Sequence, residues 1–163
     1  MNQGDAFAPG DALRNVEVLY VDPDPHRRDV IRRMILSLGA QRVQVAEAGD
    51  EALKVVLGTQ TGLVVTQHVM APMNGIALMR RIRAVGNYPR ALVPTVILGD
   101  PVGSDVFGEA LRAGANLFLI RPISPAKLYE RLSWVLNDPR PFGVKDGYYV
   151  IKPPQKSVAR ASA

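Results

Sequence analysis

The sequence predicts an α/β fold: a single doubly wound parallel sheet of five strands, followed by a C-terminal extension. Short apolar runs alternate with amphipathic segments five times along the chain. The runs are continuously apolar, which is typical of strands that are covered on both faces of a sheet. Because the connecting loops are short and each strand is followed by a helix, we expect parallel strands with helices on both faces.

The expected strands are short runs rich in valine, leucine and isoleucine, at residues 16–21, 42–46, 63–66, 92–98 and 116–120. The expected helices carry apolar residues at intervals of three and four, and they cover residues 26–38, 50–57, 76–85, 105–113 and 125–136. Glycine ends three of these helices, at Gly39, Gly58 and Gly114. Ser124 and Pro125 are suited to the N-cap and the first turn of the last helix.

Length and composition limit the classes of protein that the chain can represent. With 163 residues, of which 47% are apolar, it can fold as one domain with a full core and a short appendage. The absence of cysteine excludes disulfides and thiolate metal sites and fits a reducing cytoplasm. The apolar runs are too short to span a membrane, and residues 1–10 lack the pattern of a secretory signal. We therefore expect a cytoplasmic protein, whose net charge of +5 could favour an anionic partner.

The carboxyl ends of the strands are the positions where open parallel sheets bind their ligands. In this sequence the residues at those ends are Asp22, Pro23, Asp24, Gln67, Gly99 and Arg121. They include two acids, an amide and a base. We therefore expect this edge of the sheet to hold any site that the domain inherits from its fold.

Residues 15–137 resemble a response-regulator receiver domain of the CheY type. The landmarks that carry the resemblance are Val18-Leu19-Tyr20-Val21-Asp22, Met73-Asn74-Gly75, Ala110-Leu111-Arg112-Ala113-Gly114-Ala115-Asn116 and Arg121-Pro122-Ile123. None of them is specific alone, but their order and spacing on the predicted elements point to this family. The resemblance implies a flavodoxin-like sheet, a cis peptide bond before Pro122 and a role in two-component (phosphorelay) signalling.

The same resemblance implies a phosphorylation site at the strand ends, and this sequence departs from that site at several positions. Gln67 stands where the family has its phospho-acceptor aspartate, and a neutral amide cannot act as the nucleophile in phosphoryl transfer. Pro23 stands where the family has an acidic magnesium ligand, and it has no side-chain oxygen. Gly99 replaces a small hydroxyl residue. We therefore expect that the chain accepts no phosphoryl group and is not an enzyme.

Other positions of this site keep part of the family pattern. Asp22 is retained, Arg121 replaces a lysine, and Phe118 keeps the ring of the switch aromatic without its hydroxyl. Asp22 and Asp24 could hold a cation weakly, or they could cap the following helix. We expect Arg121 to pair with Asp22 or to bond Gln67, so that a fixed polar network fills the site and locks the domain in one state.

The two ends of the chain differ from its centre in composition. Residues 1–14 are expected to be a flexible segment, and residues 155–163, which are small and polar, to be disordered. Residues 138–154 contain prolines and glycines that exclude a long helix, together with aromatic residues that should pack against the domain or a partner. The candidate ligand or partner surface comprises Arg27, Arg28, Arg32, Arg33, Arg140, Phe142, Tyr148 and Tyr149.

Two functions of different classes follow from these patterns. The first is a stand-alone pseudo-receiver that contacts a signalling protein, such as a histidine kinase or another regulator, independently of phosphorylation; the resemblance implies contact through residues 104–111 and 125–136. The second is an effector that binds an anionic ligand, such as a cyclic dinucleotide, through the basic first helix and the tail. A minor third interpretation is an active receiver that uses His68. We expect no cofactor, no metal and no direct DNA binding, and a homodimer is compatible with the resemblance.

Overall fold

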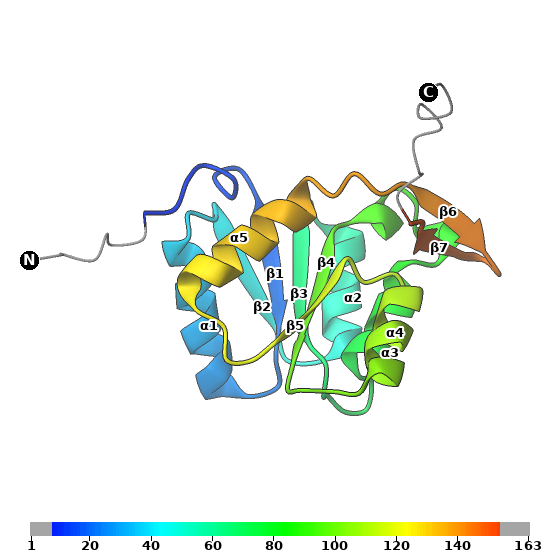
Figure 1. The fold of residues 1–163 in the computed structure, drawn as a ribbon, viewed down its shortest axis with the longest axis horizontal. Coiled ribbons are helices and arrows are strands. Elements are labelled where there is room, and N and C mark those ends of the chain that lie inside the picture. Colours follow the sequence, from blue (N-terminus) through cyan, green and yellow to red (C-terminus); the bar gives the residue numbers. More distant parts are fainter. Residues whose placement is uncertain (1–7, 154–163) are drawn as a thin grey trace, which may run out of the picture.

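The centre of the fold is one parallel sheet of five strands, in a computed structural model that describes residues 8–153. The strands lie in the order β2-β1-β3-β4-β5 (Figure 1). They are β1 Glu17–Val21, β2 Arg42–Ala46, β3 Leu63–Gln67, β4 Thr95–Gly99 and β5 Leu117–Ile120. Each strand is followed by a helix, so the structure confirms the predicted doubly wound α/β fold.

Helices cover both faces of this sheet (Figure 1). One face carries α1 Pro25–Ser37 and α5 Pro125–Leu136, and the other carries α2 Gly49–Gly58, α3 Gly75–Ile82 and α4 Ser104–Arg112. Along β1, Leu19 and Val21 point into the core under α2, α3 and α4, whereas Val18 and Tyr20 point into the core under α1 and α5. The central strands β3 and β4 are buried at every position because both of their faces are covered, whereas the edge strand β2 exposes Arg42 and Val45.

Polar caps set the starts of three helices. Asp24 caps α1, Asn74 caps α3 and Ser124 caps α5, each by accepting a hydrogen bond from a backbone N–H in the first turn. A proline follows the cap of α1 and of α5. The cap predicted at Ser124 is therefore confirmed, and of the two acids that could cap α1 only Asp24 does so.

The end of α3 differs from the prediction. The helix expected over residues 76–85 ends at Ile82, and two short 3₁₀ turns lead from it to β4. Ala84 leaves the helix because its backbone forms a β-bridge with Tyr148, far along the chain. Helical periodicity could not predict this end, because the contact that produces it is a tertiary one.

Prolines shape the loops around the sheet. The strand expected over residues 92–98 begins at Thr95, because Pro94 has no N–H to donate to a neighbouring strand. The peptide bond between Arg121 and Pro122 is cis, as the family resemblance implied. Two more X–Pro bonds are cis, those before Pro72 and Pro89.

The C-terminal tail forms a β-hairpin that the sequence analysis did not predict. Its strands are β6 Phe142–Lys145 and β7 Tyr148–Ile151, paired in antiparallel fashion. The turn residues Asp146 and Gly147 have positive φ angles, 52° and 84°, which Asp-Gly pairs adopt readily in two-residue hairpins. The hairpin lies beside α3 and α4 (Figure 1), and Tyr149 donates a backbone hydrogen bond to the carbonyl of Arg83 (2.8 Å). The described part of the tail therefore packs on its own domain.

The predictions for the two chain ends fall partly outside the described residues. This applies to residues 1–7 of the expected flexible segment and to residues 155–163, which were expected to be disordered. Within residues 8–14, however, the side chain of Leu13 is fully buried in the core under α1 and α5. The core thus begins before the predicted boundary at residue 15. Across residues 8–153, no helix is both long and apolar enough to cross a membrane.

Candidate functional site at the strand ends

The loops at the carboxyl ends of β1, β3, β4 and β5 bring the predicted site residues together. Asp22 directly follows β1, Gln67 ends β3, Gly99 ends β4 and Arg121 directly follows β5. Because these four strands are parallel neighbours, their carboxyl ends lie at one edge of the sheet. The polar side chains at this edge are linked in one hydrogen-bonded network.

Asp22 is fully buried, and both oxygens of its carboxylate accept hydrogen bonds. Arg27 binds the carboxylate with two nitrogens: Nε lies 2.6 Å from Oδ2, and Nη2 lies 2.9 Å from Oδ1. The Tyr20 hydroxyl donates to Oδ2 (2.7 Å), and the backbone N–H of Asp24 donates to Oδ1 (2.9 Å). Two donors on each oxygen, including a two-pronged guanidinium, offset the cost of burying this charge.

Arg27 reaches Asp22 because it lies in the first turn of α1. Asp24 caps this helix by accepting a hydrogen bond from the backbone N–H of Arg27 (2.7 Å), and that hydrogen bond lowers the pKa of Asp24. The cap fixes where the helix begins and so places the guanidinium near the end of β1. The hydrogen bonds to Asp22 raise the pKa of Arg27, which keeps the guanidinium charged.

The surroundings of Asp22 do not fit a magnesium ion. Mg²⁺ needs several oxygen ligands in an octahedral shell, but Pro23 offers none, and both oxygens of Asp22 are bound by Arg27. A dication at this place would be repelled by the guanidinium. In this structure Asp22 is the partner of Arg27 and Asp24 is the cap of α1. The weak cation remnant predicted at these two acids stays a prediction. Between residues 8 and 153, no group of three or more His, Cys, Asp or Glu side chains is placed to share a metal ion.

Gln67 is held by hydrogen bonds at both ends of its amide. It is 1% exposed; its Nε2 donates to the Tyr20 hydroxyl (2.8 Å), and its Oε1 accepts from Nη1 of Arg121. Because the same hydroxyl donates to Asp22, Tyr20 joins Gln67 to the ion pair at the end of β1. Burial, together with the hydrogen bond to Asp22, raises the pKa of Tyr20, so the phenol stays neutral and remains a donor.

Arg121 closes the network on the solvent side. Besides Gln67 it contacts Asp100, with Nη2 3.2 Å from Oδ1. The sequence left two possible partners for Arg121, Asp22 and Gln67. In the structure Arg121 donates to Gln67. Asp22 is paired with Arg27, which we had predicted to be part of an exposed basic surface. A basic residue at the third helical position after an acid–X–acid segment could have indicated this pair.

Gly99 leaves a space at the end of β4 that Phe118 fills. A Cβ atom at Gly99 would lie 2.9 Å from Cζ of Phe118 and 3.1 Å from Cβ of His68. Phe118 is 5% exposed, and its ring meets the His68 ring edge-on with centroids 5.4 Å apart. A hydroxyl residue at position 99 would therefore require the ring of Phe118 to move.

The arginines of α1 do not behave as one surface. Arg27 and Arg28 both bind Asp22, the first through its carboxylate and the second through its backbone carbonyl (2.9 Å). Arg32 is half-buried and Arg33 is exposed. The predicted basic group on α1 is thus divided, and half of it belongs to the strand-end network.

Arg140, predicted for the same surface, anchors the start of the tail. Its Nη2 lies 2.6 Å from Oδ2 of Asp138 and donates to the backbone carbonyl of Asn116 (2.9 Å). Asn116 in turn donates to Asp138 (3.0 Å). Burial alone would raise the pKa of Asp138, but the hydrogen bonds from Arg140 and Asn116 outweigh it and hold that pKa below its usual range.

Arg83 is a second polar centre, at the opposite end of the sheet, although the helical periodicity of residues 76–85 predicts that its side chain faces mainly outward. Its guanidinium is fully buried and donates to neutral oxygens of Ala91, Val93, Thr95, Gly114 and Asn116. Burial lowers the pKa of Arg83 to about 9, so it is charged at neutral pH. The ring of Phe142 lies 5.0 Å from the guanidinium, and Tyr149 bonds the Arg83 carbonyl. Arg83 thus joins the hairpin to the domain.

Comparisons with known proteins agree with the fold. The model of the response regulator receiver domain family matches residues 18–133. The chain belongs to the response regulator receiver family. Such receivers are signalling modules of two-component systems and act through protein partners. Chemotaxis protein CheY1 of Helicobacter pylori strain J99 is 30% identical over 123 residues, which are 75% of this receiver chain and 98% of CheY1. The CheY homolog of Campylobacter jejuni serotype O:23/36 is also 30% identical, over 75% of this chain and 93% of its own length.

Solved receiver structures share this architecture. Vibrio cholerae CheY4 superposes with a TM-score of 0.68 at 23% identity, covering 74% of this chain and 98% of CheY4. The receiver domain of the sensor histidine kinase PA1611 from Pseudomonas aeruginosa, solved with a magnesium ion in its active-site cleft, gives a TM-score of 0.67 at 26% identity. It covers 76% of this chain and 98% of that domain. Since the family match ends at residue 133, the β6–β7 hairpin is an addition to the receiver.

Proposed function

We propose that this receiver is a stand-alone pseudo-receiver in two-component signalling that acts by protein–protein contact, independently of phosphorylation. The network that runs from Arg27 through Asp22, Tyr20 and Gln67 to Arg121 carries the proposal. It puts a neutral amide at the end of β3 and a guanidinium on the buried acid that follows β1.

The site lacks three features that phosphoryl transfer requires. The acceptor must be an anionic oxygen, but Gln67 offers an amide whose two ends are already bonded. A metal must neutralise the incoming charge, but Arg27 occupies the oxygens of Asp22. A hydroxyl must meet the phosphoryl group at the end of β4, but Gly99 has none and Phe118 fills the space.

The decisive measurement is an amide NMR spectrum of the full chain with Mg²⁺ and either acetyl phosphate or beryllofluoride. We expect no shift for the amides of residues 22, 67, 99 and 121, and no gain of a phosphoryl group in the intact mass. The triple variant Pro23→Asp, Arg27→Ala and Gln67→Asp is the matched control, because it restores the acids and removes the guanidinium. Shifts at the strand ends of the wild type, or a phosphoryl group on its His68, would contradict the proposal.

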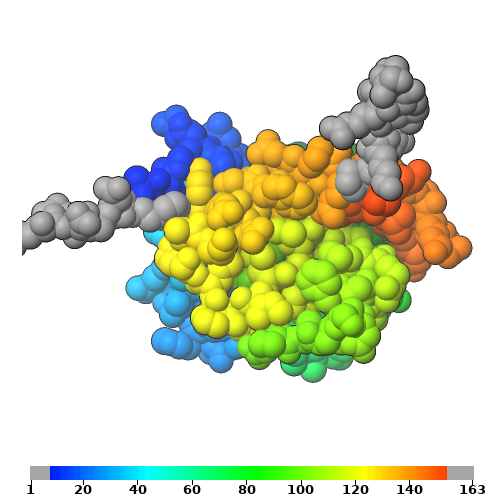
Figure 2. Space-filling model, in the orientation of Figure 1, coloured from blue at the N-terminus to red at the C-terminus, as the bar shows by residue number. Residues whose placement is uncertain are grey.

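The surface that we propose for the protein partner is the free edge of the sheet at β5. β5 is an edge strand; its last residue, Ile120, is 40% exposed, and Phe107 on α4 is 41% exposed. A hollow of about 310 Å³ follows this edge, with Pro122, Lys127 and Arg131 on its rim. Figure 2 looks onto this face, where the green atoms of α4 and the yellow atoms of α5 flank it. An apolar edge with basic residues at its rim suits an acidic, amphipathic protein surface.

The partner surface is tested by binding measurements with purified histidine kinases and receiver-linked regulators of the same organism. We expect Ile120→Lys to weaken binding at least about tenfold, because a charge would be buried at the contact. Val30→Lys on α1 is the matched control, since Val30 is similarly exposed at 44%. Binding that needs acetyl phosphate, or that survives Ile120→Lys, would contradict this proposal. Sedimentation of the same variants reports whether the edge also forms a homodimer.

A further inference from the structure

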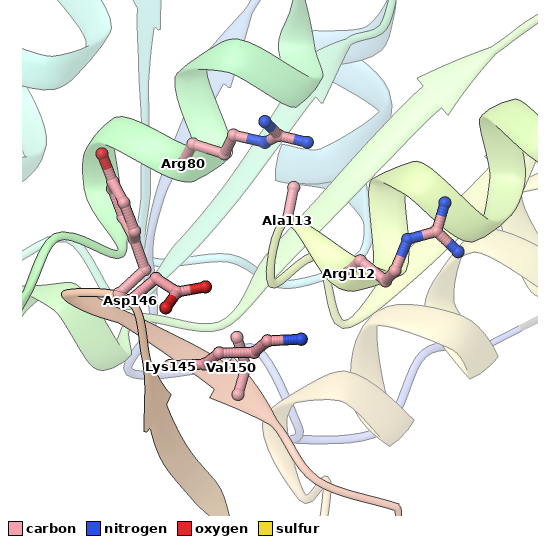
Figure 3. A pocket seen from close by; sticks show the side chains of 7 residues that line it. Arg80, Arg112, Ala113, Lys145, Asp146 and Val150 are labelled. Carbon is pink, nitrogen blue, oxygen red and sulfur yellow. The ribbon is translucent and has the colours of Figure 1, made fainter.

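A pocket of about 350 Å³ lies where the hairpin meets the helices of the receiver. Figure 3 shows Arg80 on α3, Arg112 at the end of α4, and Lys145 and Asp146 at the tip of the hairpin, all around one hollow. The volume lies in the range of small-molecule sites. Three of the seven lining residues come from the receiver, and four come from a segment beyond the family match.

We propose that this pocket binds a small soluble anion that carries phosphoryl groups, such as a diphosphate or a phosphomonoester. Three cations from three separate elements line it: Arg80 of α3, Arg112 of α4 and Lys145 of β6. Guanidinium groups match phosphate oxygens two at a time, and the lysine ammonium adds a mobile point charge.

The charges of the pocket are incompletely paired. Within residues 8–153, neither Arg112 nor Lys145 has an ion-pair partner, whereas Arg80 pairs with Glu109 at 3.6 Å, with both side chains about half exposed. An exposed pair of this kind is weak and can open. Asp146 opposes the cations from the same lining. The three cations exceed the two acids, so the pocket favours an anion.

Helix electrostatics explains only part of this arrangement. Arg80 and Arg112 lie in the last turns of α3 and α4, where basic residues offset the negative end of the helix dipole. That effect does not account for Lys145, which comes from a hairpin. It also does not account for the hollow, whose floor is the small side chain of Ala113 and whose wall includes Tyr148. The hairpin adds both a third cation and a wall to the two helix ends.

The test is an amide NMR titration of the full chain with inorganic pyrophosphate, at ionic strength held constant with sodium chloride. We expect saturable shifts for residues 113, 146 and 148. Arg112→Gln and Lys145→Gln should each weaken binding about tenfold, the effect of one lost charge-assisted contact. Asp146→Asn should tighten it severalfold, and asparagine tolerates the positive φ of this turn position. The three replaced side chains are exposed, so the fold should be retained.

Two controls make the titration decisive. Arg33→Gln removes an exposed arginine of α1 that pairs with Asp29 (3.1 Å), and it should leave the affinity unchanged. Succinate, a dianion without a phosphoryl group, should bind at least about tenfold more weakly than pyrophosphate. Equal affinity for succinate, an equal loss in Arg33→Gln, or weaker binding by Asp146→Asn would each overturn the proposal. So would the absence of saturable shifts with pyrophosphate.

Discussion

The two ends of the sheet each hold an arginine at the centre of a polar network, but the charge is balanced in different ways. At the carboxyl ends, the side chain of Arg27 is 35% exposed and faces the buried carboxylate of Asp22. At the amino ends, Arg83 is fully buried and faces neutral oxygens only. The Arg27 network thus pairs opposite charges near solvent. The Arg83 network stabilises a single buried charge with hydrogen bonds to neutral oxygens, mostly of backbone carbonyls.

The difference shows how two arginines of the same fold serve different purposes. Arg27 acts locally, on an acid five residues earlier, at the carboxyl end of β1. Arg83 acts over long range: its acceptors Ala91 and Asn116 lie eight and 33 residues away, and Phe142 of the tail covers it. The first network links the loops at the strand ends, and the second attaches an added segment.

The largest effect is expected from Arg83→Met. It removes the donor shared by several buried oxygens and the cation under Phe142, so we expect the free energy of unfolding to fall by about 3–4 kcal/mol. Urea unfolding followed by circular dichroism measures this loss, and amide exchange reports whether the hairpin is released. Arg81→Met, at an exposed neighbouring position, should change stability by less than about 0.5 kcal/mol. Equal effects of the two substitutions would contradict the buried-dipole account of Arg83.

A smaller effect is expected from Arg27→Met. The substitution leaves Asp22 buried with only Tyr20 and a backbone N–H as donors, which should cost about 1–2 kcal/mol, less than a fully buried pair because Arg27 reaches solvent. Urea unfolding measures this loss in the free energy of unfolding, with Arg33→Met as the control at an exposed position. A loss as large as that of Arg83→Met would remove the distinction between the two ends.

Tyr20→Phe probes the link between Asp22 and Gln67. The substitution deletes the hydroxyl that donates to Asp22 and accepts from Gln67. The free energy of unfolding should therefore fall by about 1 kcal/mol. The side-chain amide resonances of Gln67 should shift as well, because Nε2 loses its acceptor. If those resonances stay in place, Tyr20 does not hold the amide, and the strand-end network is two separate pairs.

The smallest effect is a pH dependence at Asp138. Its pKa is lower in the folded state than in the unfolded chain, so its contribution is fully present above about pH 4 and is lost as the pH falls through the folded pKa. Wild type should therefore exceed Asp138→Asn in stability at pH 7 by about 1 kcal/mol, and the gap should narrow towards pH 3. Unfolding curves of both proteins at pH 7 and pH 3 test this. A stability difference that is larger at pH 3 than at pH 7 would mean that folding raises the pKa of Asp138, which contradicts the prediction.

Sequence reasoning predicted the elements best where one short-range rule decided them. Strand 42–46 and helix 125–136 have the predicted bounds, because apolar runs and an N-cap act within a few residues. It failed at the end of α3, where a bridge from Ala84 to the tail sets the boundary. It also missed the hairpin, although Asp146-Gly147 is a known turn signal, because prolines and glycines nearby were interpreted only as helix breakers.

At the candidate site, the residue types were predicted, and the bond between Arg121 and Gln67 was one of two predicted alternatives, but the pair of Arg27 with Asp22 was not predicted. The presence of Gln67, Pro23 and Gly99 at the strand ends follows from chain order alone. Whether Asp22 pairs with Arg121 or with Arg27 depends on where α1 begins and on which guanidinium the fold places within hydrogen-bond distance of the buried carboxylate. Sequence position does not encode that competition.

The sequence by itself determined the doubly wound α/β fold and the residues at its strand ends, because periodicity and capping depend on residues close together in the chain. Its motifs added the resemblance to receivers. Only the tertiary structure decided that Arg27 covers Asp22, that Arg83 is buried, and that the hairpin builds a basic pocket with α3 and α4. Those outcomes depend on which charges find partners when distant segments pack together. A buried guanidinium such as that of Arg83 must donate to oxygens that lie close to it in the folded protein, and those oxygens belong to residues far apart in the sequence.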